Sequence, residues 1–373
     1  MNRLRADRCV LGKAFRAPSN LMRLSLSEWT TLINDARQCN LLGALAVAAS
    51  GDIDAFPAGP ARHLRGMSLL SQRQALSVRW EVHRLHEALR PLGQTILLLK
   101  GAAYVMGECM AARGRMFGDI DILVPRDRLG DVESRLMLNG WVSAKSSRYD
   151  QYYYRKWMHE LPPMTHVRRG TVLDVHHNIL PSTTRRHPKA EDMFARAVPI
   201  AHADLPWIRV PCPEDMLIHS ATHLAHEGEL DSAMRDLHDI DVMVSEFGHA
   251  DSFWNRVCEY STQQQLAGPV LLILKLAETV FGSNVPDHVI SALRRVERTS
   301  VGALTSIYLN AIPFRLEERT SALAVLTRSL LYIRSHALRM PAHLLIPHLL
   351  VKAFAKLKPA ATDPTDPTDR HPA

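Results

Sequence analysis

Two aspartates separated by one residue form the part of this chain best suited to chemistry. Asp119 and Asp121 lie in the run Gly-Asp-Ile-Asp-Ile-Leu-Val at positions 118–124. The Ile, Leu and Val side chains favour a β-strand, in which alternate residues face the same way. Two carboxylates on one face repel each other unless a divalent cation lies between them, and hard oxygen ligands suit Mg²⁺. The pattern indicates metal-dependent phosphoryl or nucleotidyl transfer, although such pairs also occur on solvated edge strands.

A third carboxylate follows in residues 171–177, Thr-Val-Leu-Asp-Val-His-His, which alternate like a strand. Asp174 and His176 would share one face of that strand. If it pairs beside the first strand, Asp174 completes a cluster that can hold two Mg²⁺ ions, with Mn²⁺ as an alternative. We therefore expect Asp119, Asp121 and Asp174 to be catalytic and to bind metal, with Asp174 also a candidate base. Taken alone, Asp174 would be an ordinary strand-end aspartate.

The segment before the aspartates predicts a place for a phosphate. Residues 95–99 form an apolar strand, Lys-Gly follows it, and residues 102–112 have a helical pattern. A strand, a glycine turn and a helix start present backbone N–H groups and a positive dipole end. The residues predicted to contact the nucleotide are Lys100, Gly101, Arg115 and Gly118.

Histidines supply candidates for an acceptor pocket. A helix predicted to begin at Pro213 carries His219, His223 and His226, whose offsets of four and seven place them on one face. The segment His-Ser-Ala-Thr-His lacks the glutamate of the zinc-protease motif, so a packed or polar interdomain face is preferred over zinc binding. The residues suggested for the acceptor pocket are His159, His176 and His223, with packing or surface roles as the alternative.

Two further clusters are interpreted structurally. Arg235 and Asp239 have the spacing of a helix ion pair, and the alternative is that Asp236 and Asp239 approach the nucleotide site. Residues 149–166, which include three consecutive tyrosines, are predicted to form a strand and loop beside the site. An aromatic cluster on the sheet face is preferred there over stacking on a nucleotide base.

The order of these motifs resembles that of a known family. The chain reads Leu-Leu-Lys-Gly-Ala, Gly-Asp-Ile-Asp-Ile-Leu-Val, Asn-Gly-Trp and Leu-Asp-Val-His in succession. Residues 90–245 are thereby similar to the largely uncharacterised nucleotidyltransferases of the DNA polymerase β-like superfamily. The resemblance implies a mixed sheet with helices on one side and a nucleoside triphosphate, such as ATP, as substrate. One departure is that Lys100-Gly101-Ala102 stands where typical members carry Gly-Ser.

The expected reaction is Mg²⁺-dependent transfer of a nucleoside monophosphate to an unknown acceptor, with release of pyrophosphate. The acceptor is left open between a small molecule, a protein and RNA. The alternative function is a non-catalytic nucleotide-binding or accessory protein that retains the fold.

Composition sets the broad class. The 373 residues are 46% apolar and 22% charged, as in ordinary soluble proteins. The net charge of +7 favours anionic partners, but the basic residues are scattered, so a large nucleic-acid footprint is not indicated. Five widely spaced cysteines without a Cys-x-x-Cys pair suggest reduced thiols in the cytoplasm. The most apolar stretch, 266–281, is too short and too charged to span a bilayer and is predicted to be a core helix.

The predicted class is α+β, a nucleotidyltransferase-type mixed sheet with flanking helices and a helical C-terminal region. We expect five consecutive regions along the chain. They are an N-terminal extension at 1–24, a helical region at 25–93, the α/β core at 94–210, a helical domain at 211–356 and a disordered Pro/Thr-rich tail at 357–373.

Overall fold

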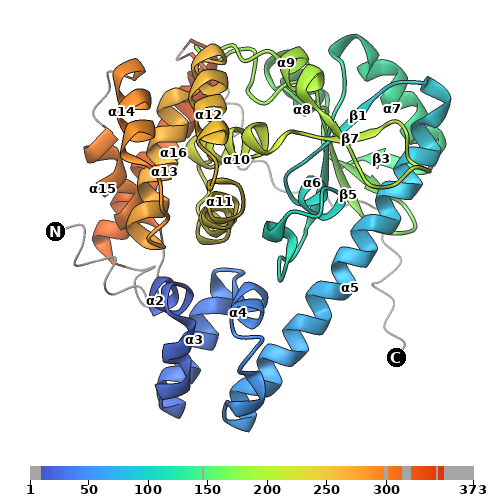
Figure 1. Ribbon diagram of the computed structural model, residues 1–373. Coiled ribbons are helices and arrows are strands. Elements are labelled where there is room, and N and C mark those ends of the chain that lie inside the picture. The colour runs from blue at the N-terminus through green and yellow to red at the C-terminus, as the bar shows by residue number, and fades with distance from the viewer. Residues whose placement is uncertain (1–9, 145–146, 298–300, 313–320, 342, 348–373) are drawn as a thin grey trace, which may run out of the picture.

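A seven-stranded mixed sheet lies beside a bundle of helices, which confirms the α+β class (Figure 1). The computed structural model describes residues 10–144, 147–297, 301–312, 321–341 and 343–347. The strand order in the sheet is β3-β4-β5-β2-β1-β7-β6. The tail predicted to be disordered lies outside the described residues.

The centre of the sheet is formed by β1 (Ile96–Leu99), β2 (Asp119–Leu123) and β5 (Val172–His176). β2 runs antiparallel to β1 and parallel to β5. All four residues of β1 are buried, and alternate strand residues face opposite sides. Protein therefore covers both faces of the sheet at this strand, rather than the single face that the resemblance implied.

The remaining strands extend the sheet on both sides of this centre. They are β3 (Trp141–Ser143), β4 (Met164–His166), β6 (Val198–Pro199) and β7 (Ile208–Val210). β7 pairs with β1 in parallel, and β4 pairs with β5 in antiparallel fashion.

One long helix connects the N-terminal helices to the sheet. This helix, α5 (Ala58–Leu89), is 32 residues long and contacts α6 (Lys100–Met106) and α7 (Leu129–Leu138). The helix expected at 102–112 ends at Met106 and is followed by a short 3₁₀ turn, Met110–Ala112.

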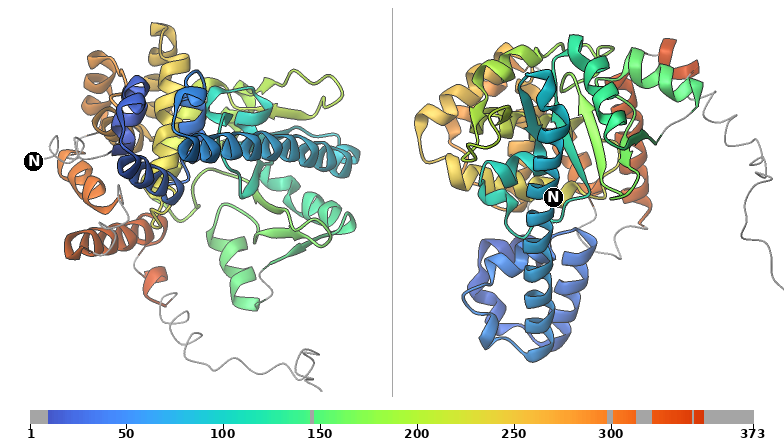
Figure 2. Two further views of the ribbon diagram at one scale, coloured as in Figure 1. Left: turned by 90° about the horizontal axis from the view of Figure 1, so that it is seen from below. Right: turned by 90° about the vertical axis from the view of Figure 1, so that its right-hand side faces the viewer.

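The N-terminal helices form a small group at the far end of α5. Figure 2 shows this group projecting from the rest of the molecule. Its members are α2 (Val10–Arg16), the 3₁₀ turn Pro18–Arg23, α3 (Leu26–Gln38), α4 (Leu42–Ala48) and the 3₁₀ turn Ile53–Ala55. Leu11 of α2 is fully buried, so the part of the N-terminal extension that the structure describes is packed against the fold.

The C-terminal half of the chain is helical, as predicted. The helices are α10 (Pro213–His226), α11 (Ala233–Phe247), α12 (Asp251–Gln263), α13 (Ala267–Val280), α14 (Asp287–Val296), α15 (Val301–Ala311) and α16 (Ala322–Arg339). α10 is almost entirely buried and contacts α11, α12, α13 and α6, so it joins the bundle to the sheet. α13 is the core helix expected at 266–281. Within the described part of the chain, no helix has the length and apolar character needed to cross a membrane.

The strand predicted within residues 149–166 is largely wrong. Residues Arg148–Trp157 form a helix, α8, and only Met164–His166 is a strand. The Ser147 side chain accepts a hydrogen bond from the backbone N–H of Asp150, which starts the helix. The consecutive tyrosines consequently point in different directions around α8. Farther along the chain, the short helix α9 (Ala190–Arg196) precedes β6.

Candidate functional site

The pairing of β2 with β5 brings the three predicted carboxylates together. Asp121 and Asp174 are direct partners across the two parallel strands. Asp119 lies two residues earlier on β2, on the same face. All three line one cavity of about 350 Å³ between the sheet and the helices.

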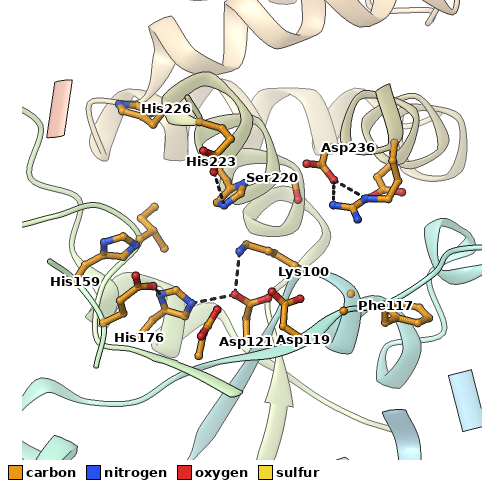
Figure 3. A pocket seen from close by; sticks show the side chains of 18 of the residues that line it. Lys100, Phe117, Asp119, Asp121, His159, His176, Ser220, His223, His226 and Asp236 are labelled. Atoms are coloured by element: carbon orange, nitrogen blue, oxygen red, sulfur yellow. Dashed lines mark hydrogen bonds and ion pairs between the residues drawn. The ribbon is translucent and has the colours of Figure 1, made fainter. Parts of the chain in front are cut away.

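Asp121 is held by two cationic or polar partners. The Lys100 Nζ lies 2.9 Å from its Oδ1, and the His176 Nε2 lies 3.0 Å from the same oxygen (Figure 3). Asp121 is only 2% exposed. Burial alone would raise its pKa, but the charge of Lys100 and the hydrogen bond from His176 outweigh burial and lower the pKa well below its usual range. Asp121 is therefore a fixed anion.

The other two carboxylates lack such compensation. The buried Oδ1 of Asp174 has no hydrogen-bond partner among the described residues. Burial, followed by the charge of Asp121, raises the pKa of Asp174 to about 7. The Asp119 side chain is open to solvent at the cavity, yet partial desolvation and the charge of Asp121 raise its pKa as well. The cluster repels itself, and a cation would relieve that repulsion.

The cavity as a whole is acidic although the protein is basic. Among the described residues, seven carboxylate side chains and four Lys or Arg side chains line it, whereas the chain carries a net charge of +7. An anionic substrate would therefore meet an excess of negative charge here unless cations accompany it.

A comparison with protein families identifies the chain. A family described as uncharacterised nucleotidyltransferase matches residues 25–282. The chain belongs to this family. The match confirms the resemblance drawn from the motifs at 90–245 and extends it through the N-terminal helices to the end of α13. Membership implies a nucleoside triphosphate substrate. No match was found among curated proteins.

In the turn after β1, predicted to bind phosphate, Lys100 and Gly101 also have contacts within the protein. Lys100 lines the cavity but is engaged with Asp121; burial alone would lower its pKa, and the Asp121 charge outweighs that effect and raises it. A Cβ added to Gly101 would lie 2.6 Å from a ring carbon of Phe117. Gly101 thus has a packing reason to be glycine. At Gly118 a Cβ would meet nothing within 4 Å, and this residue faces the cavity.

Arg115, predicted to contact phosphate, is buried and bound to the helical region. Its guanidinium donates a hydrogen bond to Asp239 of α11, and its Nη1 lies 3.8 Å from the Asp236 Oδ1. The predicted pair between Arg235 and Asp239 is wrong, because Arg115 takes Asp239 while Arg235 bonds its neighbour Asp236 at 2.7 Å. Asp236 and Asp239 line the cavity, which agrees with the alternative interpretation that these two aspartates approach the nucleotide site.

The three histidines suggested for an acceptor pocket all line the cavity. His176 bridges two carboxylates, because its Nδ1 lies 3.2 Å from the Glu160 Oε2 while its Nε2 contacts Asp121. His159 lies beside His176, with ring centroids 5.3 Å apart. His223 faces the cavity from α10, on the side opposite the strands (Figure 3).

Several cavity residues were missed by sequence reasoning. They are Tyr104, Glu160, Ser220, Glu227 and Arg339. Glu160 directly follows the proposed His159, which was a usable signal. Arg339 lies on α16, far from the motifs in sequence, and no local pattern points to it.

Proposed function

We propose that this nucleotidyltransferase uses Mg²⁺ to move a nucleoside monophosphate from a nucleoside triphosphate to an acceptor, releasing pyrophosphate. The observation that carries the proposal is the alignment of Asp121 with Asp174 across β2 and β5. Asp119 shares their cavity, so three acidic side chains from two strands converge on one space.

The donor set fits a hard divalent cation. Asp119, Asp121 and Asp174 offer only carboxylate oxygens, which Mg²⁺ and Mn²⁺ prefer. The Oδ1 of Asp174 is buried and has no hydrogen-bond partner in the part of the chain that the structure describes, and a bound ion would supply one. When bound, such ions neutralise the triphosphate and activate the attacking group.

The chain's own residues orient this cluster. Lys100 and His176 fix the position and charge of Asp121. The unpartnered Oδ1 of Asp174 is the atom available to complete the ligand set or to take a proton from the acceptor. Lys100, Gly101 and Gly118 border the space for the phosphates, and His159, His176 and His223 border the space for the acceptor.

Charge explains why metal and nucleotide should bind together. Of the four Lys or Arg side chains that line the cavity, Lys100 contacts Asp121, Arg115 contacts Asp239 and Arg235 contacts Asp236. The fourth, Arg339, lies 3.5 Å from Glu227, so among the described residues little positive charge remains to receive a triphosphate directly. We expect ATP, CTP, GTP or UTP to raise the melting temperature only when Mg²⁺ or Mn²⁺ is present.

Labelled triphosphates incubated with the protein and a cell extract should reveal the acceptor, whether a small molecule, a protein or RNA. The D119N variant should fold normally and lose transfer, because Asp119 is exposed and its role is to bind the ion. The control is D127N, which changes an exposed carboxylate outside the cavity. Full transfer by D119N would refute the metal assignment. Absence of any nucleotide response in the wild type would favour the non-catalytic alternative.

A further inference from the structure

A second group of metal-binding side chains adjoins the carboxylate cluster. His159, Glu160 and His176 each offer one ligand atom, and these atoms all lie within 4.8 Å of one another. The group comprises two imidazoles and one carboxylate, whereas the neighbouring cluster consists of carboxylates alone. All three side chains face the cavity that Asp121 lines.

The backbone fixes these side chains at the end of β5. Glu160 and His176 form an isolated antiparallel bridge. On either side, the His177 N–H donates to the His159 carbonyl at 2.8 Å and the Leu161 N–H donates to the Val175 carbonyl at 2.8 Å. The donors therefore come from two hydrogen-bonded segments and are positioned before any ligand binds, which favours metal binding.

One nitrogen of the group lacks a partner. The Nδ1 of His159 is buried and makes no hydrogen bond to the described residues. Leaving a buried polar atom unpaired is energetically unfavourable. No hydrogen bond from the described residues accounts for this atom, and a cation would.

We propose that His159, Glu160 and His176 bind a borderline divalent cation, with Zn²⁺ the preferred ion, at a site separate from the carboxylate cluster. Imidazole nitrogen suits Zn²⁺ better than Mg²⁺. Two histidines and one glutamate are also a ligand set found in zinc enzymes, where the fourth coordination position of the metal is left open. Here that position would face the cavity.

The proposed site is connected to Asp121 through His176. The Nδ1 of His176 lies toward Glu160, and its Nε2 contacts the Asp121 Oδ1. A cation on Nδ1 would leave the proton on Nε2, which then donates to Asp121. A metal-bound histidine that donates its other N–H to a carboxylate is held in one tautomer and orientation. Occupancy of the site would therefore fix the orientation of Asp121.

The test is metal binding by protein that carries no histidine tag. Zn²⁺ is titrated by calorimetry, and Co²⁺ is titrated by its visible absorption, which increases strongly when nitrogen ligands bind. We expect H159A and E160Q each to weaken Zn²⁺ binding about 100-fold or more. E160Q keeps the side-chain shape, so it remains informative if H159A fails to fold.

Two controls separate this site from other positions for the ion. H249A removes an exposed imidazole outside the cavity, and D119N removes a carboxylate of the neighbouring cluster. Both should bind Zn²⁺ within about threefold of the wild type. Unchanged binding in E160Q and H159A would overturn the proposal. So would binding that is lost in D119N and D174N but kept in H159A, because the ion would then occupy the carboxylates. Neither result bears on nucleotidyl transfer, since the measurement is of metal binding.

Discussion

Asp121 of β2 and Asp174 of β5 stand opposite each other on adjacent parallel strands, where backbones are about 4.8 Å apart. Asp121 is stabilised as an anion by Lys100 and His176, whereas Asp174 has a buried oxygen that no described residue hydrogen-bonds. Paired positions on one sheet thus have opposite electrostatic surroundings, and this difference leads to distinct predictions for the two aspartates.

Replacing Asp174 should stabilise the metal-free protein at high pH. The folded protein holds the pKa of Asp174 at about 7, because of burial and the Asp121 charge, against 3.8 for the unperturbed group. The folded state therefore binds this proton more tightly than the unfolded state, and stability falls as pH rises through this interval. With a chelator present, D174N should melt several degrees above the wild type near about pH 8, and the gap should narrow near about pH 5. Equal melting temperatures at both pH values would contradict the repulsion inferred here.

Replacing Asp121, in contrast, should destabilise the protein. D121N leaves Lys100 and His176 without the carboxylate that both contact. Breaking a buried charge pair on one side costs about 3–5 kcal/mol, less where water reaches the remaining partner. Since the Lys100 side chain is 20% exposed, we expect D121N to lower the free energy of unfolding, measured by urea denaturation, by about 2–3 kcal/mol. D119N is the matched control and should change stability by less than about 1 kcal/mol. A D121N protein as stable as D119N would show that the Lys100 contact is not stabilising.

Removing Arg115 should weaken the joint between the sheet and the helical region. Arg115 is 8% exposed and bonds Asp239, whose pKa burial raises to about 7 even with this partner present. R115A would leave Asp239 buried and unpaired, at a cost of about 3–5 kcal/mol. R113A, an exposed arginine two residues earlier, is the control and should have little effect. Equal denaturation midpoints for R113A and R115A would contradict this role.

Substituting Gly101 should be a steric test of the turn after β1. A methyl group there would overlap the Phe117 ring, so G101A should destabilise the protein by about 1–3 kcal/mol. G118A is the control, because its added carbon meets nothing within 4 Å. Adding F117A to G101A should cost less than the sum of the two single changes. If the losses of stability in the two single variants simply add in the double variant, the need for glycine at position 101 has another cause, for example contact with the nucleotide.

The carboxylate cluster was largely predictable from sequence, because each aspartate lies in a short strand whose alternating pattern is local. Alternation in two short strands fixes which side chains share a face, and only the pairing of β2 with β5 had to be assumed. Arg115 could not be placed in this way, because its partner Asp239 is 124 residues away and an i, i+4 pair within α11 was equally compatible with the sequence. The helix α8 was missed because its aromatic residues also favour strands, while the Ser147 cap decided the outcome.

The cavity that contains the carboxylates is also lined by a residue from outside the part of the chain that the family model matches. The family match ends at residue 282, yet Arg339 of α16 lines the same cavity and its guanidinium donates to the His226 carbonyl at 3.2 Å. The lining of the cavity thus includes a side chain from outside the residues that the family model matches. Replacing Arg339 should therefore change the cavity lining while leaving the acidic cluster in place.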